Sequence, residues 1–479
     1  MEQVLMFKPK NTFKLSLFSS LILSTSAFAL EKPKSMEDMW KIIEAQQKQI
    51  EALQNAKSLP EEIPTKSPHS EVKTLERKTD ILSQEVEKLR TNLAIPEDPK
   101  YKSAYGMGPA ASKVYQVGKG LSIGGYGEAM YTSYVNDRHD TQTNKDSADL
   151  ERAVIYLGYK FNDWIVLNNE IEFEHASTGE GSEEKGEVSV EFSQLDFLLD
   201  PKYNIRAGLM LVPMGFINEM HEPTTYHGNR RPDTERYIIP STWREMGAGL
   251  FGEVLPGLQY RAYAVTGLNS QGFMNSGIKE GRQGGSNAKA EDFAFTGRLD
   301  YSPLQISGLT VGAATFLGNS GQEDITFDDK NYNVFTQMYE GHIQYKHRSL
   351  ELRALGTWSH IADTAALNPM LGADGSVGQE SFGAYGEAAY DIMPLVWHDS
   401  SQYLAPFFRV ERYNTLAAVA TGFDNSVGLD RWIYQAGLSY KPIPNIVVKA
   451  DYRNIQDRKI APLGIPTGDE FNLGFGFIY

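Results

Sequence analysis

The 479-residue chain has no cysteine, which excludes a disulfide framework, a CxxC redox site, cysteine-ligated zinc and a thiol nucleophile. It also has no apolar run of about 18 residues, so a bundle of membrane-spanning helices is excluded. Positive charge is in deficit, because 46 Lys and Arg stand against 61 Asp and Glu. Nucleic acid is therefore not a predicted partner, since binding it requires a basic face that displaces counterions.

Aromatic residues and glycine, by contrast, are abundant, with 23 Phe, 25 Tyr and 43 Gly. This combination favours many short strands joined by turns, either in a soluble protein or in a membrane barrel. Composition alone does not choose between these two.

Residues 1–29 have the features of a secretory signal peptide. Three lysines precede the largely apolar stretch 15–26, and Ala27 and Ala29 supply the small residues that signal peptidase requires. Cleavage is expected after Ala29, so the chain is expected to act outside the cytoplasm. The alternative is a buried or membrane-anchoring helix.

Residues 30–95 contain two short heptad repeats, separated by prolines that break helices. The apolar positions of the first are Met36, Met39, Ile43, Ile50 and Leu53; those of the second are Val72, Leu75, Leu82, Val86, Leu89 and Leu93. Each repeat is too short to be stable alone, so we expect a coiled coil with partners. The alternative is a monomeric amphipathic helix folded on the following domain. Residues 96–119, rich in proline and glycine, are predicted to be a linker.

From Gly120 onward the apolar period changes to two, which is typical of strands. Sixteen strands are predicted, at 120–134, 148–161, 163–176, 187–200, 202–212, 243–254, 257–268, 291–303, 309–318, 331–346, 349–360, 380–391, 403–413, 430–441, 445–455 and 468–479. A loss of alternation near Ser193 predicts a β-bulge in the fourth strand.

The connections between these strands alternate between short and long. Tight turns are expected at positions such as 162–163 and 200–201, whereas the intervening links are long and polar; the link 392–402 is an exception. Sorting of connections by length, with an even number of strands, is typical of outer-membrane barrels. The last strand ends on aromatic Tyr479 and alternates apolar with polar residues, as the assembly signals of such barrels do.

The resemblance to a known class follows from these features and one motif. The stretch 205–216, IRAGLMLVPMGF, is similar to the strand-to-loop passage of phosphate-selective porins O and P. A coiled coil ahead of a barrel also resembles dicarboxylate-channel porins. Residues 120–479 thus resemble a Gram-negative outer-membrane porin, which implies passive diffusion of solutes and a homotrimer with one pore in each barrel. Phosphate itself is not predicted, because 213–242 contains no lysine.

In such porins the third long loop folds inward and narrows the pore, and here the third long connection is 213–242. The residues expected at the constriction are Glu219, Glu222, Arg230, Arg231, Asp233, Glu235 and Arg236. Opposed charges across a narrow passage would orient dipolar solutes. The alternative is a surface loop with solvated salt pairs.

One arginine lies on the predicted lumen face of each of eight strands. These pore-lining residues are Arg152, Arg206, Arg261, Arg298, Arg353, Arg409, Arg431 and Arg453. A ladder of permanently charged guanidinium groups would pass anions through many weak sites. The same face carries many carboxylates, so a lumen of paired charges is an open alternative.

Other functions find less support. No GxSxG elbow occurs, so an enzyme is not predicted. His221, Glu222 and His227 could bind a metal, but no HExxH helix surrounds them and a polar loop is favoured. No phosphate loop or dinucleotide fingerprint indicates a cofactor. A structural role remains, in which the coiled coil tethers the barrel to peptidoglycan or to a periplasmic partner.

The sequence therefore predicts an all-β fold, a 16-stranded antiparallel transmembrane β-barrel preceded by an N-terminal α-helical coiled coil. The predicted location is the cell outer membrane, in contact with its lipid and with the N-terminal segment in the periplasm. The predicted function is a porin for small hydrophilic, anionic solutes.

Overall fold

The computed structural model of the protein describes residues 102–135, 145–178, 186–371 and 376–479. The predicted signal peptide, coiled coil and start of the linker lie outside these residues. Within the described ranges, no helix combines the length and the apolar character needed to cross a bilayer.

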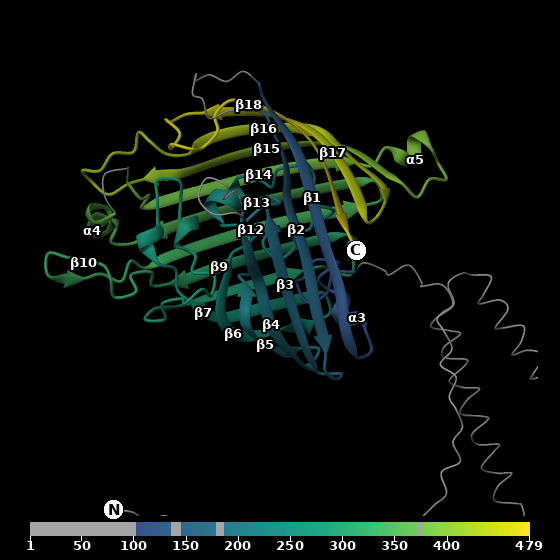
Figure 1. The fold of residues 1–479 in the computed structure, drawn as a ribbon, viewed down its shortest axis with the longest axis horizontal. Coiled ribbons are helices and arrows are strands. Elements are labelled where there is room, and N and C mark those ends of the chain that lie inside the picture. Colours follow the sequence, from purple (N-terminus) through teal and green to yellow (C-terminus); the bar gives the residue numbers. More distant parts are fainter. Residues whose placement is uncertain (1–101, 136–144, 179–185, 372–375) are drawn as a thin grey trace, which may run out of the picture. The chain divides into compact units, whose positions relative to one another are not determined.

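Sixteen antiparallel strands of the described chain close into one barrel, in the order β1-β18-β17-β16-β15-β14-β13-β12-β9-β8-β7-β6-β5-β4-β3-β2 (Figure 1). Their bounds are β1 Gly120–Val135, β2 Ser147–Lys160, β3 Ile165–Glu174, β4 Val188–Asp200, β5 Tyr203–Leu211, β6 Arg244–Leu255, β7 Leu258–Thr266, β8 Phe293–Tyr301, β9 Leu309–Gly318, β12 Thr336–His347, β13 Leu350–Ile361, β14 Glu380–Tyr390, β15 Tyr403–Ala418, β16 Asp430–Ile443, β17 Ile446–Asp457 and β18 Asp469–Ile478. The barrel closes where β1 pairs with β18.

The predicted 16-stranded antiparallel barrel is confirmed, and every predicted strand overlaps an observed one. The largest differences are at two ends. The strand predicted at 331–346 begins only at Thr336, because the preceding residues form a hairpin of β10 (Thr326–Phe327) and β11 (Lys330–Asn331). The strand predicted at 403–413 continues to Ala418.

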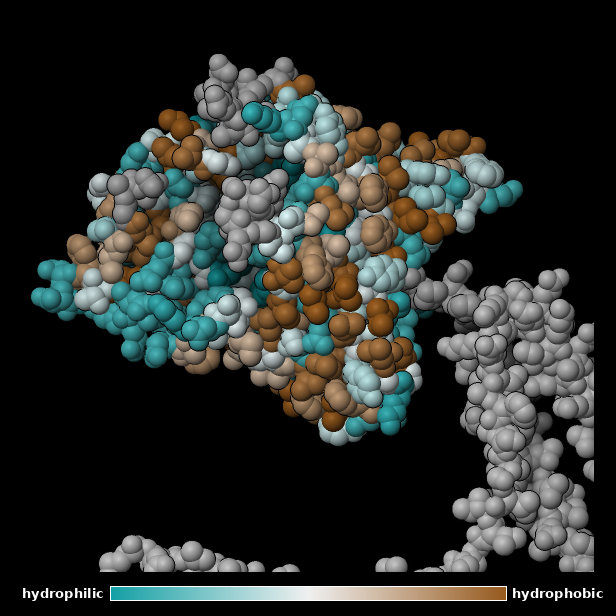
Figure 2. Space-filling view, viewed as in Figure 1, coloured by the Kyte–Doolittle hydropathy of each residue, from teal (hydrophilic) through white to brown (hydrophobic). Residues whose placement is uncertain are grey.

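Side chains alternate between the two faces of the barrel wall. In β18, Phe471, Leu473 and Phe475 are 42%, 48% and 50% exposed on the outside, whereas Asn472 between them is fully buried. Figure 2 shows apolar residues over the outer face of β1 to β5 and hydrophilic residues at one end. An apolar outer wall around a polar interior is typical of barrels that face lipid.

Exposed aromatic side chains form two bands on the outer wall. One band lies near the short turns and contains Phe161, Trp164, Tyr203, Tyr301 and Tyr390. The other lies near the long connections and contains Tyr131, Phe293, Tyr339, Trp358 and Phe471. Such girdles mark the two bilayer interfaces in membrane barrels.

The two ends of the barrel differ. The C-terminus and α3 (Lys113–Gln116) lie toward the end with the short turns, and β10 and α4 (Thr364–Leu367) toward the end with the long connections (Figure 1). The exceptional link at 392–402 contains α5 (Met393–Val396), which accounts for its length. Single turns in the long connections are η3 (Thr234–Ile238), η4 (Ser270–Gly272), η5 (Lys279–Gly281) and η6 (Asn368–Met370).

Candidate functional site

The connection 213–242, called the third loop below, contacts lumen-facing side chains on opposite walls. His221 Nε2 lies 3.1 Å from Glu170 Oε1 on β3, and the carbonyl oxygen of Thr225 accepts a hydrogen bond of 3.2 Å from Arg353 on β13. Strands β3 and β13 are eight strands apart around the ring of sixteen. The loop also contacts β1, where Tyr226 donates a hydrogen bond of 2.8 Å to Glu128. On β16, Lys441 donates a hydrogen bond of 2.9 Å to the carbonyl oxygen of Thr224.

Two predicted constriction acids of the third loop form buried ion pairs with the wall. Glu219 pairs with Arg261 at 3.0 Å, and Asp233 pairs with Arg453 at 2.9 Å. Although burial opposes ionisation, the guanidinium group of Arg453 holds the pKa of Asp233 below its usual value. These two charges therefore fasten the loop rather than face open space.

The other two acids accept hydrogen bonds from uncharged donors. Glu222 accepts from the backbone amides of Ala110 and Ala111 at 2.8 and 3.1 Å. Burial raises the pKa of Glu222 to about 7, although the two amides oppose this shift. Glu235 accepts from the Ile217 amide and the Tyr385 hydroxyl, and burial raises its pKa as well.

The three predicted constriction arginines are only half-buried. Arg230 donates to Thr132 at 3.2 Å and lies 3.8 Å from Glu470. Within the described chain, neither Arg231 nor Arg236 forms an ion pair; Arg231 contacts the carbonyl of His221 at 3.5 Å, and Arg236 lies over the ring of Tyr237. All three line a common cavity.

This cavity, called the basic chamber below, has a volume of about 400 Å³ and is lined by the third loop, by β1 to β4, by β17 and β18, and by the connection that follows β7. Its cations are Arg152, Arg230, Arg231, Arg236, Arg244, Lys279, Arg282 and Lys449, and its acids are Glu128, Glu151, Glu172, Glu174, Glu187, Glu191 and Glu280. Among the described residues, four of these cations lack a carboxylate within ion-pair distance: Arg231, Arg236, Arg282 and Lys449.

Two of these unpaired cations also have polar atoms with unused hydrogen-bonding capacity. The Nε of Arg231 and the Nζ of Lys449 are buried and have no hydrogen-bond partner in the described part of the chain. Lys449 lies 3.7 Å from the ring centroid of Tyr226, which accounts for its position. Both atoms are buried, so an anion in the chamber would reach them only after the surrounding side chains move.

Seven of the eight predicted pore-lining arginines are buried and ion-paired. The pairs are Arg152 with Glu128, Glu151 and Glu172, Arg206 with Asp196, Arg261 with Glu219 and Asp300, Arg298 with Asp300, Arg409 with Glu387, Arg431 with Asp457, and Arg453 with Asp233 and Glu470. The eighth, Arg353, lies over the ring of Phe216. These contacts favour the alternative of a paired lumen over a continuous ladder of free guanidinium groups.

The described part of the predicted linker differs from expectation. Residues 102–117, called the plug segment below, pack against lumen-facing side chains. Tyr115 donates to Asp196 at 2.6 Å, and Asn168 donates to the carbonyl oxygen of Ala111 at 2.9 Å. Met107 is buried in a cluster with aromatic residues of β1, β2 and β4. The plug segment and the third loop meet at the two amides that Glu222 accepts from.

Small residues allow this close approach. A Cβ on Gly108 would lie 2.5 Å from Glu222 Oε1, so a larger residue would displace the carboxylate. Gly106 has a φ of +85°, and a Cβ there would lie 2.5 Å from Arg261 Nη1. Read as sequence, the same glycines are typical of a flexible linker, so no local signal identified the plug segment.

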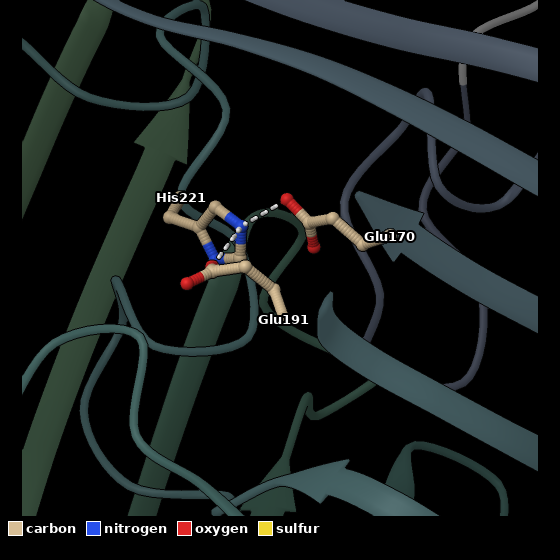
Figure 3. A group of neighbouring side chains, drawn as sticks. All are labelled: Glu170, Glu191 and His221. Carbon is tan, nitrogen blue, oxygen red and sulfur yellow. Dashed lines mark hydrogen bonds and ion pairs between the residues drawn. The ribbon is translucent and has the colours of Figure 1, made fainter. Parts of the chain in front are cut away.

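The three possible metal ligands in the third loop do not gather. Glu222 faces the plug segment, and His227 pairs with Glu387 at 2.9 Å. His221 instead lies beside Glu170 and Glu191 (Figure 3). A register shift against β3 leaves Glu191 as an extra residue in β4, which turns it inward beside Phe192. The predicted bulge therefore exists, two residues before Ser193.

Comparison with known proteins gives one relative in sequence. No family model matches the chain. An uncharacterized protein of Aquifex aeolicus (strain VF5) is 39% identical over 385 residues, which cover 78% of this chain and 84% of that protein.

Solved structures of outer-membrane proteins share the fold. OmpF of Salmonella typhi, in complex with daunomycin, is 14% identical with a TM-score of 0.51, and the match covers 76% of this chain and 98% of that one. The outer membrane channel DcaP of Acinetobacter baumannii is 11% identical (TM-score 0.47; 75% and 97% covered). An anion-selective porin from Comamonas acidovorans is 9% identical (TM-score 0.46; 75% and 99% covered).

Proposed function

We propose that this chain, which belongs to the same family as the uncharacterized Aquifex aeolicus protein, is an outer-membrane porin for small hydrophilic, anionic solutes. The closed barrel, its apolar outer wall and its two aromatic bands support a location in the outer membrane. Transport would be passive and would involve no covalent chemistry.

The observation that carries the preference for anions is the unpaired charge in the basic chamber. Arg231, Arg236 and Arg282 remain charged at any working pH. Within the described chain they have no carboxylate partner at ion-pair distance, whereas the buried arginines of the lumen do. An anion entering the chamber would gain charge-assisted hydrogen bonds from these three guanidinium groups, which supply positive charge locally in a chamber that holds eight cations and seven carboxylates.

We infer that the third loop forms the constriction. Its contacts with β3 and β13 support a path across the lumen, and two of its acids, Glu219 and Asp233, pair with arginines of the wall. A second cavity of about 310 Å³, lined in part by Tyr105, Glu219, Arg261 and His342, lies toward the short turns. Solutes would bind weakly in such chambers and leave again, as conduction requires.

The assembly and the N-terminal segment are also proposals. A homotrimer with one pore in each barrel is what the resemblance to porins implies. The predicted coiled coil at 30–95 would then lie in the periplasm and would support assembly or contact peptidoglycan or a periplasmic partner.

A second candidate function is supported by the plug segment. Residues 102–117 occupy lumen space beside Asn168, Asp196 and Glu222. If this segment and the third loop together closed the barrel, the protein would be a structural barrel that its coiled coil anchors to the periplasm.

Liposome swelling separates these functions. We would compare solutes of similar size: gluconate, glucose and glucosamine. The porin proposal predicts swelling fastest in gluconate and slowest in glucosamine. Equal or reversed rates would contradict the anion preference, and the absence of swelling with a correctly folded barrel would favour the anchoring function.

A further inference from the structure

A group of three buried side chains lies where the third loop meets the wall formed by β3 and β4. Glu170, Glu191 and His221 each offer one ligand atom, and these atoms all lie within 4.8 Å of one another. Figure 3 shows the His221 ring with its Nε2 edge toward both carboxylates, which come from neighbouring strands. None of the three side chains has more than 2% exposure.

The hydrogen bond of His221 Nδ1 determines the protonation of Nε2, the ring nitrogen that faces the carboxylates. Nδ1 lies 2.9 Å from the carbonyl oxygen of Asn218, which can only accept, so Nδ1 carries a proton. In a neutral ring, Nε2 then presents a lone pair toward Glu170 Oε1 at 3.1 Å and Glu191 Oε2 at 3.8 Å. Three acceptors facing one another require a cation or a proton between them.

The hydrogen-bond inventory shows that these carboxylates have oxygens to spare. Glu170 Oε2 and Glu191 Oε2 are buried without a hydrogen-bond partner in the described chain. Glu191 uses its other oxygen for Arg244 at 2.8 Å, and neighbouring Glu172 pairs with Arg152 at 3.2 Å. Glu170 has His221 as its only ion-pair partner among the described residues. When His221 is neutral, the negative charge of Glu170 therefore has no cationic ion-pair partner among the described residues.

We propose that Glu170, Glu191 and His221 bind a divalent first-row metal ion such as Zn²⁺ or Mn²⁺. Ligands bound to zinc at about 2.0–2.1 Å are separated by about 3.3 Å in a tetrahedral site, close to the 3.1 and 3.8 Å observed here. Imidazole with carboxylates suits such ions, and the bond from Nδ1 to a backbone carbonyl is the usual orientation of a ligating histidine. The ion would fasten the third loop to β3 and β4, whether or not the barrel conducts.

Metal content of the full chain tests this proposal. Protein purified in detergent is stripped with EDTA, dialysed against micromolar ZnCl₂ or MnCl₂, and assayed by mass spectrometry for metal per chain. We expect one equivalent more in the wild type than in Glu170→Gln or His221→Ala. His227→Ala removes another buried histidine of the same loop, outside the group of three, and should retain the wild-type content.

Folding of each variant is checked by its heat-modifiable mobility on gels, and Glu170→Gln preserves side-chain volume if His221→Ala does not fold. Bound metal should also raise the temperature of the mobility shift in the wild type and leave that of Glu170→Gln unchanged. Equal metal content in all four folded proteins, or no metal in any, would overturn the proposal and leave a shared proton between His221 and Glu170.

Discussion

Individual arginines inside the barrel differ in whether a carboxylate accompanies them. Arg206 and Arg409 are 2% and 1% exposed and form ion pairs with Asp196 and Glu387. A buried ion pair attracts a passing charged solute only weakly, because the fields of its two opposite charges largely cancel. Arg231 and Arg236 lack such partners in the described chain, so they should dominate selectivity.

Replacing the unpaired arginines should change ion preference. We expect Arg231→Ala with Arg236→Ala to lower the chloride-to-potassium permeability ratio by about twofold or more, because the remaining cations of the chamber mostly have partners. Reversal potential in a salt gradient measures the ratio. Lys330→Ala removes one exposed charge from β11 and serves as the control. An unchanged ratio in the double variant would remove both arginines from the selectivity mechanism.

The ion pair between Asp233 and Arg453 should hold the third loop in place. Asp233→Asn leaves Arg453 with Glu470 alone, and loss of a buried partner should cost up to about 3 kcal/mol. We therefore expect the heat-induced mobility shift to begin several degrees lower and single-channel current to become noisier. Asp324→Asn breaks a partly exposed pair with Lys289 and should have almost no effect. Matching behaviour of the two variants would argue against this anchoring role.

The plug segment and the third loop both contact lumen-facing side chains of the barrel wall. Both contribute residues to the buried contact at Glu222, so each limits the movement of the other. Neither has regular secondary structure over most of its length. Their positions follow from side-chain contacts with the wall.

Removing the plug segment should widen the pore. We expect deletion of 102–117 to raise single-channel conductance by about twofold or more, because the segment occupies lumen space beside Asn168 and Asp196. Deletion of 35–95 provides the matched control, since it shortens the same N-terminal region and leaves the plug segment; conductance should stay close to that of the wild type. A conductance that falls or stays constant without 102–117 would mean that this segment does not limit flow.

The strands of the barrel could be predicted from the sequence because their signal is local. Alternation of apolar and polar residues, as in β18, is set by one face meeting an apolar exterior, and it needs no knowledge of distant residues. The bulge in β4 was predicted two residues late, because Phe192 and Gln194 both point inward and only the extra residue Glu191 breaks the pattern.

Contacts across the whole barrel could not be predicted in the same way. Arg453 lies opposite Glu470 on the neighbouring strand β18, so this pair follows from the strand register. Its other partner, Asp233, is 220 residues away along the chain in the third loop. The alternation of residues in the strands predicted which charged side chains face the lumen. It did not predict which of them form ion pairs there. The plug segment was expected to be a linker because it is rich in glycine. In the structure these glycines allow close packing against Glu222 and Arg261, and that role is not visible in the sequence.

At the scale of the whole described chain, a closed wall surrounds a lumen in which most arginines are paired, and the basic chamber holds cations without a carboxylate partner among the described residues. The most direct test is single-channel recording of the full chain in a planar bilayer, with reversal potential measured in a KCl gradient. We expect discrete conductance steps, which occur in groups of three if the protein is a homotrimer. We also expect a reversal potential that is closer to the equilibrium potential of chloride than to that of potassium. A reversal potential on the potassium side would contradict the role of the basic chamber, and a folded barrel without steps would contradict the porin function itself.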